Sequence, residues 1–510
     1  MNVSNWLEKH EDFQPDKIAL RIFKDLESEE CWNYSFLSER TRCWARGLKH
    51  LLGVQRGDRV AFLGYNHPDM LSLMFACARL GSILVPLNWR LAPAEHAYIA
   101  KNAGIHCLIA EEDFVTHAIE VKKSVPECHL VSLDFYQDEW NSHSELLSSL
   151  GKDDANPNVG YENPWLIVYT SGTTGHPKGA VLTQEAIFWN ALNSLHLHGM
   201  KPTDQILSVL PFFHVGPLNI QTTPALYAGA SVLMTPRFDP ELTLKLIEAT
   251  GPDLLLMVPV TMQALLRNAL WEQTDLSSLR LMVTGSSIVP KNLIEGFHQR
   301  NIPVGQVFGS TETAPIAAVL RKEDAFSKVG STGKPALHCE VKIVDDSGCE
   351  LPPGKTGELW VKGANVMQEY WGDPEATAEA FQEGWFKSGD LGFRDEEGFI
   401  TINDRKKDII ISGGENIYPA ELEGVLRKNE SVADVAVVGR PDPDWGEVPM
   451  AFIELQSGTT FDEQKTRQLC DEQLARFKHP KSFIVLEQLP RNTMGKVLKY
   501  ELRKTVNEMN

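Results

Sequence analysis

Short apolar runs alternate with longer amphipathic stretches through most of this chain of 510 residues. The run 58–64 has the length and apolar character of a strand, and the segment 69–80 has the composition of a buried helix. The same order returns at 230–235, 241–250 and 253–258. Strands that alternate with helices favour largely parallel sheets with helices on their faces. An α/β fold is therefore predicted, with a large N-terminal body of mostly parallel α/β subdomains.

The pattern changes in the last third of the chain. Two runs of alternating apolar and polar residues lie within 340–363, around turns rich in Gly and Pro, and they predict a β-hairpin. We expect the N-terminal body to span 1–403, with a small β-rich part at about 330–403. A charged stretch at 404–408 is the expected hinge, and 409–510 is the expected small mobile α+β domain.

The charge balance excludes one large class of function. The chain has 49 Lys and Arg residues against 68 Asp and Glu residues, a formal net charge of −19. A chain this acidic has no global attraction for the phosphate backbone of DNA or RNA. No nucleic-acid partner is therefore expected. The C-terminal end differs, because basic residues outnumber acidic ones from Leu474 onward. This excess indicates either a solvated face or a positive surface that meets a phosphorylated ligand.

Neither the cysteines nor any apolar segment points to secretion or to a membrane span. The eight cysteines include no pair with the two-residue spacing of zinc or redox motifs, which favours reduced thiols in a cytoplasmic protein. The most apolar window, 70–87, contains Arg79, Gly81 and Pro86. We expect it to form a buried helix capped by Gly81 and then a short strand, not a transmembrane segment. Peripheral membrane contact and the oligomeric state stay open.

The most informative local signal is the string WLIVYTSGTTGHPKGAVL, residues 165–182. Its glycines let backbone N–H groups converge on an anion, its hydroxyls add donors, and its lysine adds a positive charge. The string thus predicts a polyphosphate cradle. Its residues are Thr170, Ser171, Gly172, Thr173, Thr174, Gly175 and Lys178. The order differs from a Walker loop, in which the lysine directly follows the last glycine and a helix begins at once, so this loop is expected to join two strands.

This string closely resembles the phosphate loop of the adenylate-forming enzymes, which include acyl- and aryl-CoA synthetases, adenylation domains of peptide synthetases and firefly-type luciferases. The resemblance extends over nearly the whole chain. It implies that Mg²⁺ and ATP activate a carboxylic acid as acyl-AMP with release of pyrophosphate, and that CoA then takes the acyl group. Within the family the chain looks most like fatty acyl-CoA synthetases, so a medium- or long-chain fatty acid is the expected substrate.

The resemblance also assigns roles to residues of the strings VFGSTETAP and LPFFHVGPLN. Phe308 and Gly309 would contact adenine, with Phe308 in place of the family's usual tyrosine. Thr311 would lie near the phosphates and Glu312 would bind Mg²⁺, which prefers one or two carboxylates when it is bound to ATP. His214 would lie beside the substrate carboxylate, where its aromatic neighbours fit a tunnel for a hydrophobic acid.

The resemblance assigns three further residues to contacts with the nucleotide or the acid. Asp390, in FKSGDLGF, would accept hydrogen bonds from the two ribose hydroxyls. Arg405, in DRKKD, would lie near the ribose and the phosphates. Lys496, near the C-terminus, would neutralise charge as the carboxylate approaches the α-phosphate.

Other matches concern motion and the second half-reaction. Lys407 corresponds to the hinge position, where a backbone change swings the small domain. Gly413 and Gly414 correspond to a segment that lines the pantetheine channel. One departure stands out, because Ser286 and Ser287 occupy positions where relatives mostly carry glycine. Their side chains narrow the acyl pocket or add a hydroxyl contact, which leaves the chain length of the acid open.

Three alternatives remain. The chain is an aryl- or short-chain acid:CoA ligase of the same family, an adenylating enzyme that loads a separate carrier protein, or a non-catalytic nucleotide-binding protein. The intact set of Lys178, Glu312, Asp390, Arg405 and Lys496 disfavours the last. A P-loop NTPase is disfavoured by the order of the loop, and it would release ADP where this family releases AMP.

Overall fold

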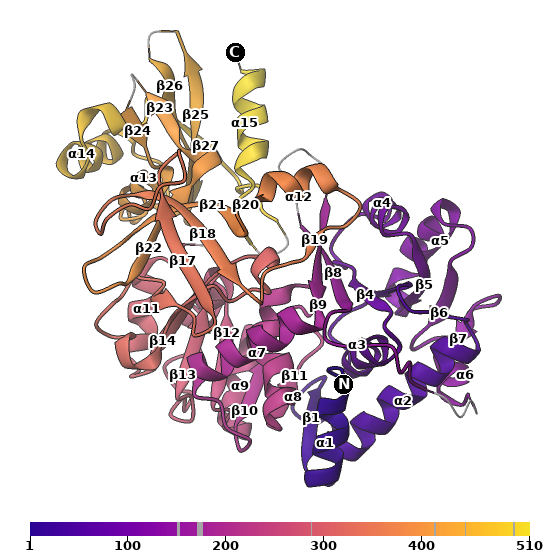
Figure 1. Ribbon diagram of the computed structural model, residues 1–510. Coiled ribbons are helices and arrows are strands. Elements are labelled where there is room, and N and C mark those ends of the chain that lie inside the picture. The colour runs from indigo at the N-terminus through magenta and orange to yellow at the C-terminus, as the bar shows by residue number, and fades with distance from the viewer. Residues whose placement is uncertain are drawn as a thin grey trace.

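A computed structural model describes residues 1–149, 154–170, 177–286, 288–412, 415–443, 445–492 and 495–509. A large N-terminal body carries a smaller C-terminal domain, which stands at the upper left in Figure 1. The body contains two mostly parallel sheets with helices and one small antiparallel sheet, and the C-terminal domain mixes strands with helices. The predicted α/β class and its arrangement are thus confirmed.

One sheet of the body has eight strands in the described part of the chain, in the order β19-β9-β8-β4-β3-β5-β6-β7. Its pairs from β8 through β4 to β7 are parallel, whereas β9 pairs antiparallel with β8 and with β19. The strands are β3 (Arg59–Leu63), β4 (Ile83–Pro86), β5 (Ile105–Ala110), β6 (His129–Ser132), β7 (Asn141–Ser142), β8 (Pro164–Thr170), β9 (Lys178–Thr183) and β19 (Glu369–Tyr370).

The other large sheet has nine strands in the same described part, in the order β16-β15-β14-β13-β12-β10-β11-β1-β2. Every pair from β14 to β1 is parallel. The strands are β1 (Ile18–Phe23), β2 (Glu29–Asn33), β10 (Gln205–Ser208), β11 (Ser231–Met234), β12 (Leu254–Met257), β13 (Leu281–Thr284), β14 (Val304–Phe308), β15 (Ala318–Leu320) and β16 (Lys334–Pro335).

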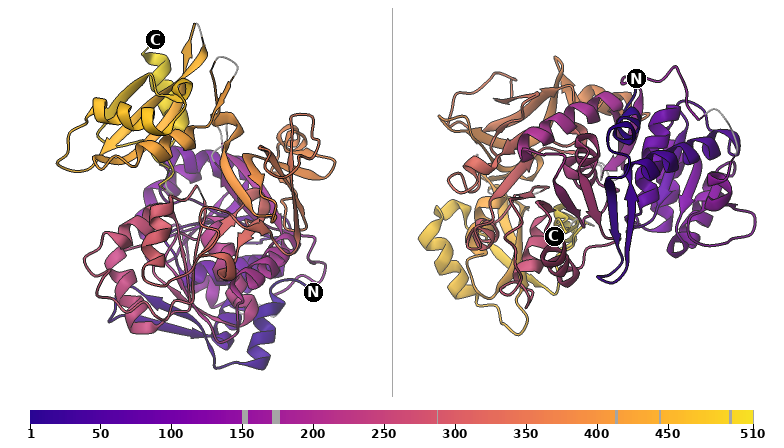
Figure 2. Two further views of the ribbon diagram at one scale, coloured as in Figure 1. Left: turned by 90° about the vertical axis from the view of Figure 1, so that its left-hand side faces the viewer. Right: turned by 90° about the horizontal axis from the view of Figure 1, so that it is seen from below.

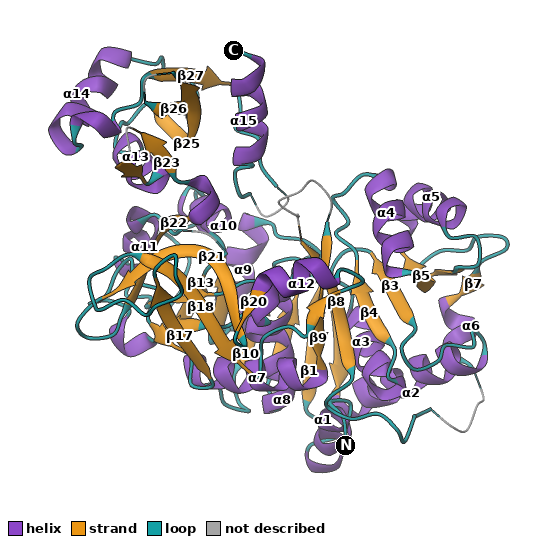
Figure 3. Cartoon of the chain, turned by 45° about the horizontal axis from the view of Figure 1, so that its top comes forward, coloured by secondary structure: helices purple, strands orange, loops and turns teal. Residues whose placement is uncertain are grey.

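Helices pack against both large sheets, as Figure 3 shows. They are α1 (Asn5–Phe13), α2 (Tyr34–His50), α3 (Pro68–Leu80), α4 (Pro93–Ala103), α5 (Val115–Ser124), α6 (His143–Leu147), α7 (Gln184–His198), α8 (Thr223–Ala228), α9 (Pro240–Thr250), α10 (Pro259–Leu266) and α11 (Lys291–His298). The predicted buried helix is α3, and it ends at Gly81 in the left-handed conformation with φ 76°. No helix in the described ranges combines the length and apolarity that a membrane crossing requires.

The β-rich part of the body is a five-stranded sheet in the described chain. Its strands are β17 (Cys339–Val344), β18 (Gly357–Gly363), β20 (Phe381–Gln382), β21 (Trp385–Arg394) and β22 (Ile400–Arg405), and α12 (Pro374–Ala380) precedes β20. The hairpin predicted within 340–363 is confirmed, because β17 and β18 pair antiparallel along their whole length.

The C-terminal domain has a sheet of its own, separate from those of the body (Figure 2). Its two apolar clusters contain residues of this domain alone. Its strands are β23 (Ile410–Ser412), β24 (Glu415–Ile417), β25 (Val432–Asp442), β26 (Gly446–Leu455) and β27 (Ser482–Leu486), and its helices are α13 (Pro419–Leu426), α14 (Glu463–Gln473) and α15 (Lys499–Glu508). The chain changes sheets between Arg405 and Ile410. The hinge at 404–408, which lies at this junction, stays a prediction.

Candidate active site

The predicted phosphate loop lies between two strands, as its order implies. β8 ends at Thr170, β9 begins at Lys178, and these two residues are partners in the antiparallel register. The chain then enters α7, whose first turn is capped by the hydroxyl of Thr183. Five of the predicted cradle residues, Ser171, Gly172, Thr173, Thr174 and Gly175, lie outside the described residues, so their phosphate contacts stay a prediction.

Lys178 lies beside two residues that follow much later in the sequence. Its Nζ is 5.4 Å from the centroid of the Tyr370 ring and 4.0 Å from a carboxylate oxygen of Asp373. The hydroxyl of Tyr370 in turn donates a hydrogen bond of 2.8 Å to Oε1 of Glu312. The structure therefore brings Lys178 to the ring, and Glu312 to the hydroxyl, of the same tyrosine. The sequence analysis missed Tyr370, which no local pattern around 370 marks.

The loop after β14 presents the predicted metal-binding carboxylate. Phe308 ends the strand and is buried, and any side chain at Gly309 would overlap the carbonyl oxygen of Pro315. A 3₁₀ turn over Thr311–Thr313 then carries Glu312, which pairs with no Lys, Arg or His in the described part of the chain. A carboxylate that no cation neutralises, beside hydroxyl groups, is a set of hard oxygen donors that fits Mg²⁺.

Asp390 and Arg405 face each other across two strands of the β-rich sheet. They are register partners on β21 and β22, and Nε of Arg405 lies 3.3 Å from Oδ1 of Asp390. Burial raises the pKa of Asp390 above its ordinary value, while the charges of Arg405 and Lys496 oppose that shift. The result is a buried acceptor with cations nearby, which suits a pair of ribose hydroxyls.

Lys496 reaches this group from a hairpin of the C-terminal domain. Its N–H donates to Oδ1 of Asn492 over 2.9 Å, and its carbonyl accepts from the Asn492 N–H over 2.7 Å. Gly495 has φ 75°, and a Cβ there would lie 2.8 Å from Val260 on α10 of the body. Burial, with the repulsion of Arg405, lowers the pKa of Lys496 to about 8, although Asp390 opposes the shift.

The expected hinge residue is held by the last helix. Arg503 of α15 donates to Oδ1 of Asp408 over 2.6 Å and to the carbonyl of Lys407 over 3.3 Å. Burial lowers the pKa of Lys407, with a smaller contribution from Arg405. The hinge role of Lys407 stays a prediction, and so does the channel role of Gly413 and Gly414, which lie outside the described residues.

His214 lies among aromatic side chains after β10. Its ring centroid is 4.3 Å from that of Phe213, which contacts the edge of Trp89 with centroids 6.2 Å apart. Burial lowers the pKa of His214 to about 3, so the imidazole is neutral at pH 7. Its Nε2 is buried without a hydrogen-bond partner among the described residues. A π-helical turn, Pro217–Thr222, follows immediately.

Other buried polar atoms near the ends of the same sheet also lack partners in the described chain. They are Oγ1 of Thr284, Nε2 of Gln306 and Oγ of Ser310. Thr284 and Gln306 are register neighbours on β13 and β14. The sequence analysis did not single out these residues, although each polar side chain stands near the end of an apolar run. Ser286, flagged there as a departure, adopts φ 74°, a conformation that favours glycine.

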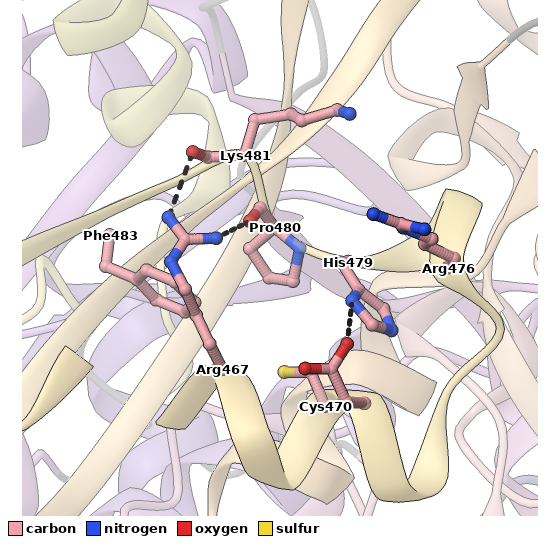
Figure 4. Close-up of a pocket in the computed structure, with 8 residues that line it drawn as sticks. Arg467, Cys470, Arg476, His479, Pro480, Lys481 and Phe483 are labelled. Atoms are coloured by element: carbon pink, nitrogen blue, oxygen red, sulfur yellow. Dashed lines mark hydrogen bonds and ion pairs between the residues drawn. The ribbon is translucent and has the colours of Figure 1, made fainter. Parts of the chain in front are cut away.

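A separate cavity of about 240 Å³ lies in the C-terminal domain between α14 and β27 (Figure 4). Arg467 donates to the carbonyls of Pro480 and Lys481, and His479 lies 3.5 Å from Asp471. Arg476 and Lys481 line the cavity, and neither makes an ion pair within the described ranges. The cavity is therefore a positive surface in the predicted basic segment. It lies apart from the group around Asp390, none of whose members line it.

Comparison with known proteins extends over nearly the whole chain. A family model described as AMP-binding enzyme matches residues 7–371, and the model of the AMP-binding enzyme C-terminal domain matches residues 421–496. Indoleacetate–CoA ligase of Aromatoleum aromaticum is 45% identical over 509 residues, covering 99% of this chain and 98% of that protein. Feruloyl-CoA synthase of an Amycolatopsis species is 38% identical and covers 92% of this chain and 93% of its own.

A solved structure shows the same architecture. The o-succinylbenzoate CoA synthetase of Bacillus subtilis, in complex with its acyl-adenylate intermediate, matches with a TM-score of 0.87 and 32% identity, covering 98% of each chain. That protein has also been solved with ATP and a magnesium ion.

Proposed function

This chain belongs to the family of AMP-binding enzymes, and from that premise we propose that it activates an aromatic carboxylic acid as acyl-AMP and transfers the acyl group to CoA. The observation that carries the proposal is the meeting of Asp390, Arg405 and Lys496, from two domains, while Lys178 and Glu312 flank Tyr370. A non-catalytic nucleotide-binding protein does not require Lys496 to be held there. ATP and CoA are then substrates, with Mg²⁺ bound to ATP.

The expectation of a fatty acid is not supported by the relatives. Those reported above are named for indoleacetate, ferulate and o-succinylbenzoate, all of which contain an aromatic ring. The alternative of an aryl acid therefore fits better. The unpartnered Nε2 of His214 offers a neutral hydrogen-bonding group to the acid.

In the first half-reaction the residues of this chain would bind MgATP and neutralise negative charge on the phosphates. Lys178 and the predicted loop would hold phosphate oxygens, Asp390 would accept from the ribose, and Glu312 would hold the metal ion. Mg²⁺ would supply shielding of the phosphate charges. Lys496 would lie between the carboxylate and the α-phosphate and lower the repulsion between them as they approach. Such positioning accounts for much of catalysis at phosphorus.

In the second half-reaction the C-terminal domain would turn about 404–408. This motion would withdraw Lys496 and bring Gly413 and Gly414 toward CoA. Two steps at one site explain why the functional residues are divided between a body and a separate domain. The positive cavity with Arg476 and Lys481 offers cations to the phosphates of CoA.

The pH dependence of adenylation should depend on Lys496. Its ammonium is the active form, and its pKa is lowered to about 8, so the value of kcat/KM for ATP should fall as the pH rises through about 8. Acid-dependent ATP–pyrophosphate exchange between pH 6 and 10 measures this. In Lys496→Arg the falling limb should move to higher pH, because a guanidinium stays charged. A limb that stays at the same pH in this variant would assign the titration to another group.

A panel of acids tests the proposed substrate class. AMP release is measured with arylacetic, hydroxycinnamic and benzoic acids beside straight-chain acids of 4 to about 16 carbons, with and without CoA. We expect an aromatic acid to exceed the best straight-chain acid by at least about tenfold in kcat/KM, the scale on which an apolar pocket discriminates. Preference for a long straight chain would refute the aromatic acid, and release of ADP and phosphate in place of AMP would refute the ligase.

A further inference from the structure

We propose that Tyr370 is a positioning residue that orients the Glu312 carboxylate toward the metal ion of bound ATP. The proposal rests on the function above, because it takes the binding of MgATP as the task of this site. Tyr370 touches both charged groups that would meet the triphosphate, Glu312 through its hydroxyl and Lys178 through its ring. Neither the sequence analysis nor the comparisons assign it a role.

The segment that carries Tyr370 also fixes the backbone of Glu312. Asn365 is fully buried, and its side-chain amide donates to the carbonyls of Thr313 and Ile316 over 2.6 and 2.9 Å. The N–H of Met367 donates to the carbonyl of Glu312 itself over 2.7 Å. The main chain of the metal-binding turn is therefore held, and the carboxylate needs only its side-chain torsions to be set.

The same segment is attached to the strand of the phosphate-loop lysine. The N–H of Gln368 donates to the carbonyl of Val181 over 2.9 Å, and that of Trp371 donates to the carbonyl of Gly179 over 2.7 Å. On the other side the Tyr370 N–H donates to Oγ1 of Thr377 over 3.0 Å. The main chain of Tyr370 is thus held on both sides by hydrogen bonds.

The hydroxyl determines which carboxylate oxygen is available to a cation. It donates to Oε1 of Glu312 and so occupies one lone pair of that oxygen, while Oε2 stays fully available to the metal ion. The phenol is the donor in this pair, because an ionised carboxylate can only accept. Hydrogen-bond partners that orient metal ligands typically contribute about 10- to 100-fold to metal affinity.

Two substitutions separate the hydroxyl from the ring. Tyr370→Phe removes the donor to Glu312 and keeps the aromatic face 5.4 Å from Nζ of Lys178. Tyr370→Leu removes both contacts. Tyr161→Phe is the matched control, because it deletes a half-buried tyrosine hydroxyl that accepts from Nε1 of Trp6 on α1, a residue with no assigned role in nucleotide binding.

The test measures binding of ATP to the full chain by calorimetry without any acid, once with Mg²⁺ and once with EDTA. For Tyr370→Phe we expect the preference for MgATP over metal-free ATP to fall by about tenfold, with metal-free ATP bound as in the wild type. For Tyr370→Leu we expect weaker binding of both forms, since the contact with Lys178 is also lost. Tyr161→Phe should behave as the wild type.

Two results would overturn the proposal. One is a Tyr370→Phe variant that keeps the full preference for MgATP. The other is equal weakening of MgATP and metal-free ATP in that variant, which indicates a merely structural role. Because no acid is present, a wrong assignment of the acid leaves the measurement intact. Absence of ATP binding by the wild type would instead refute the proposed function.

Discussion

Replacement of Lys496 by alanine should lower acid-dependent ATP–pyrophosphate exchange by about 100- to 1000-fold, the usual cost of removing one group that stabilises developing charge. The ammonium is half-buried beside Arg405 and Asp390, where water shields the repulsion between two anions less than in bulk solution. Formation of the thioester from supplied acyl-AMP should proceed at nearly the wild-type rate, because the proposed domain motion would withdraw this lysine before CoA attacks.

Lys504→Ala is the matched control, since this lysine of α15 is exposed and pairs only locally with Glu501. It should change neither half-reaction. Equal loss of exchange and of thioester formation in Lys496→Ala would mean that the residue serves folding or domain docking and not the charge of the first step.

Replacement of Asp390 by alanine should weaken the binding of ATP by at least about 100-fold, because two expected charge-assisted hydrogen bonds of about 1.5–3 kcal/mol each would be lost. The loss also leaves Arg405 without its partner at 3.3 Å. Equilibrium binding of MgATP measures the effect. Asp346→Asn, an exposed carboxylate of the same β-rich part, serves as the control.

The nucleotide itself provides a second arm of this experiment. If Asp390 binds the ribose hydroxyls, 2′,3′-dideoxy-ATP should bind the wild type weakly and should lose little more in Asp390→Ala. If the loss of affinity from removing the ribose hydroxyls and the loss from Asp390→Ala were fully additive, the carboxylate would not bind these hydroxyls.

Local features of the fold could be predicted because their causes are local. The helix 69–80 ends where Gly81 takes the left-handed conformation, and the phosphate loop joins two strands, β8 and β9. The hairpin within 340–363 follows from alternation around a turn. The sheet order could not be predicted, because pairs such as Leu20 with Val232 join segments that are far apart in the sequence.

The candidate site likewise contains residues that a local sequence motif predicts and residues that only the three-dimensional structure reveals. Glu312, Asp390 and Lys496 each lie in a string that marks them, and the structure places the last two together. Tyr370 was missed because its partner lies 58 residues earlier in the chain. The class of acid could not be predicted for a related reason, since hydrophobic neighbours of His214 suit an aliphatic chain and an aromatic ring equally well.

Arg405 closes the β-rich sheet and is also the residue from which the chain departs for the C-terminal domain. If Asp390 binds the ribose and 404–408 is the hinge, the partner of the ribose-binding carboxylate is also the residue at which the hinge begins. Rotation of the domain would then disturb the contact with the sugar, and release of the sugar would free the hinge. This coupling would delay the release of AMP until the domain rotates back. It would also keep the acyl-adenylate bound until the thiol of CoA has reached the site.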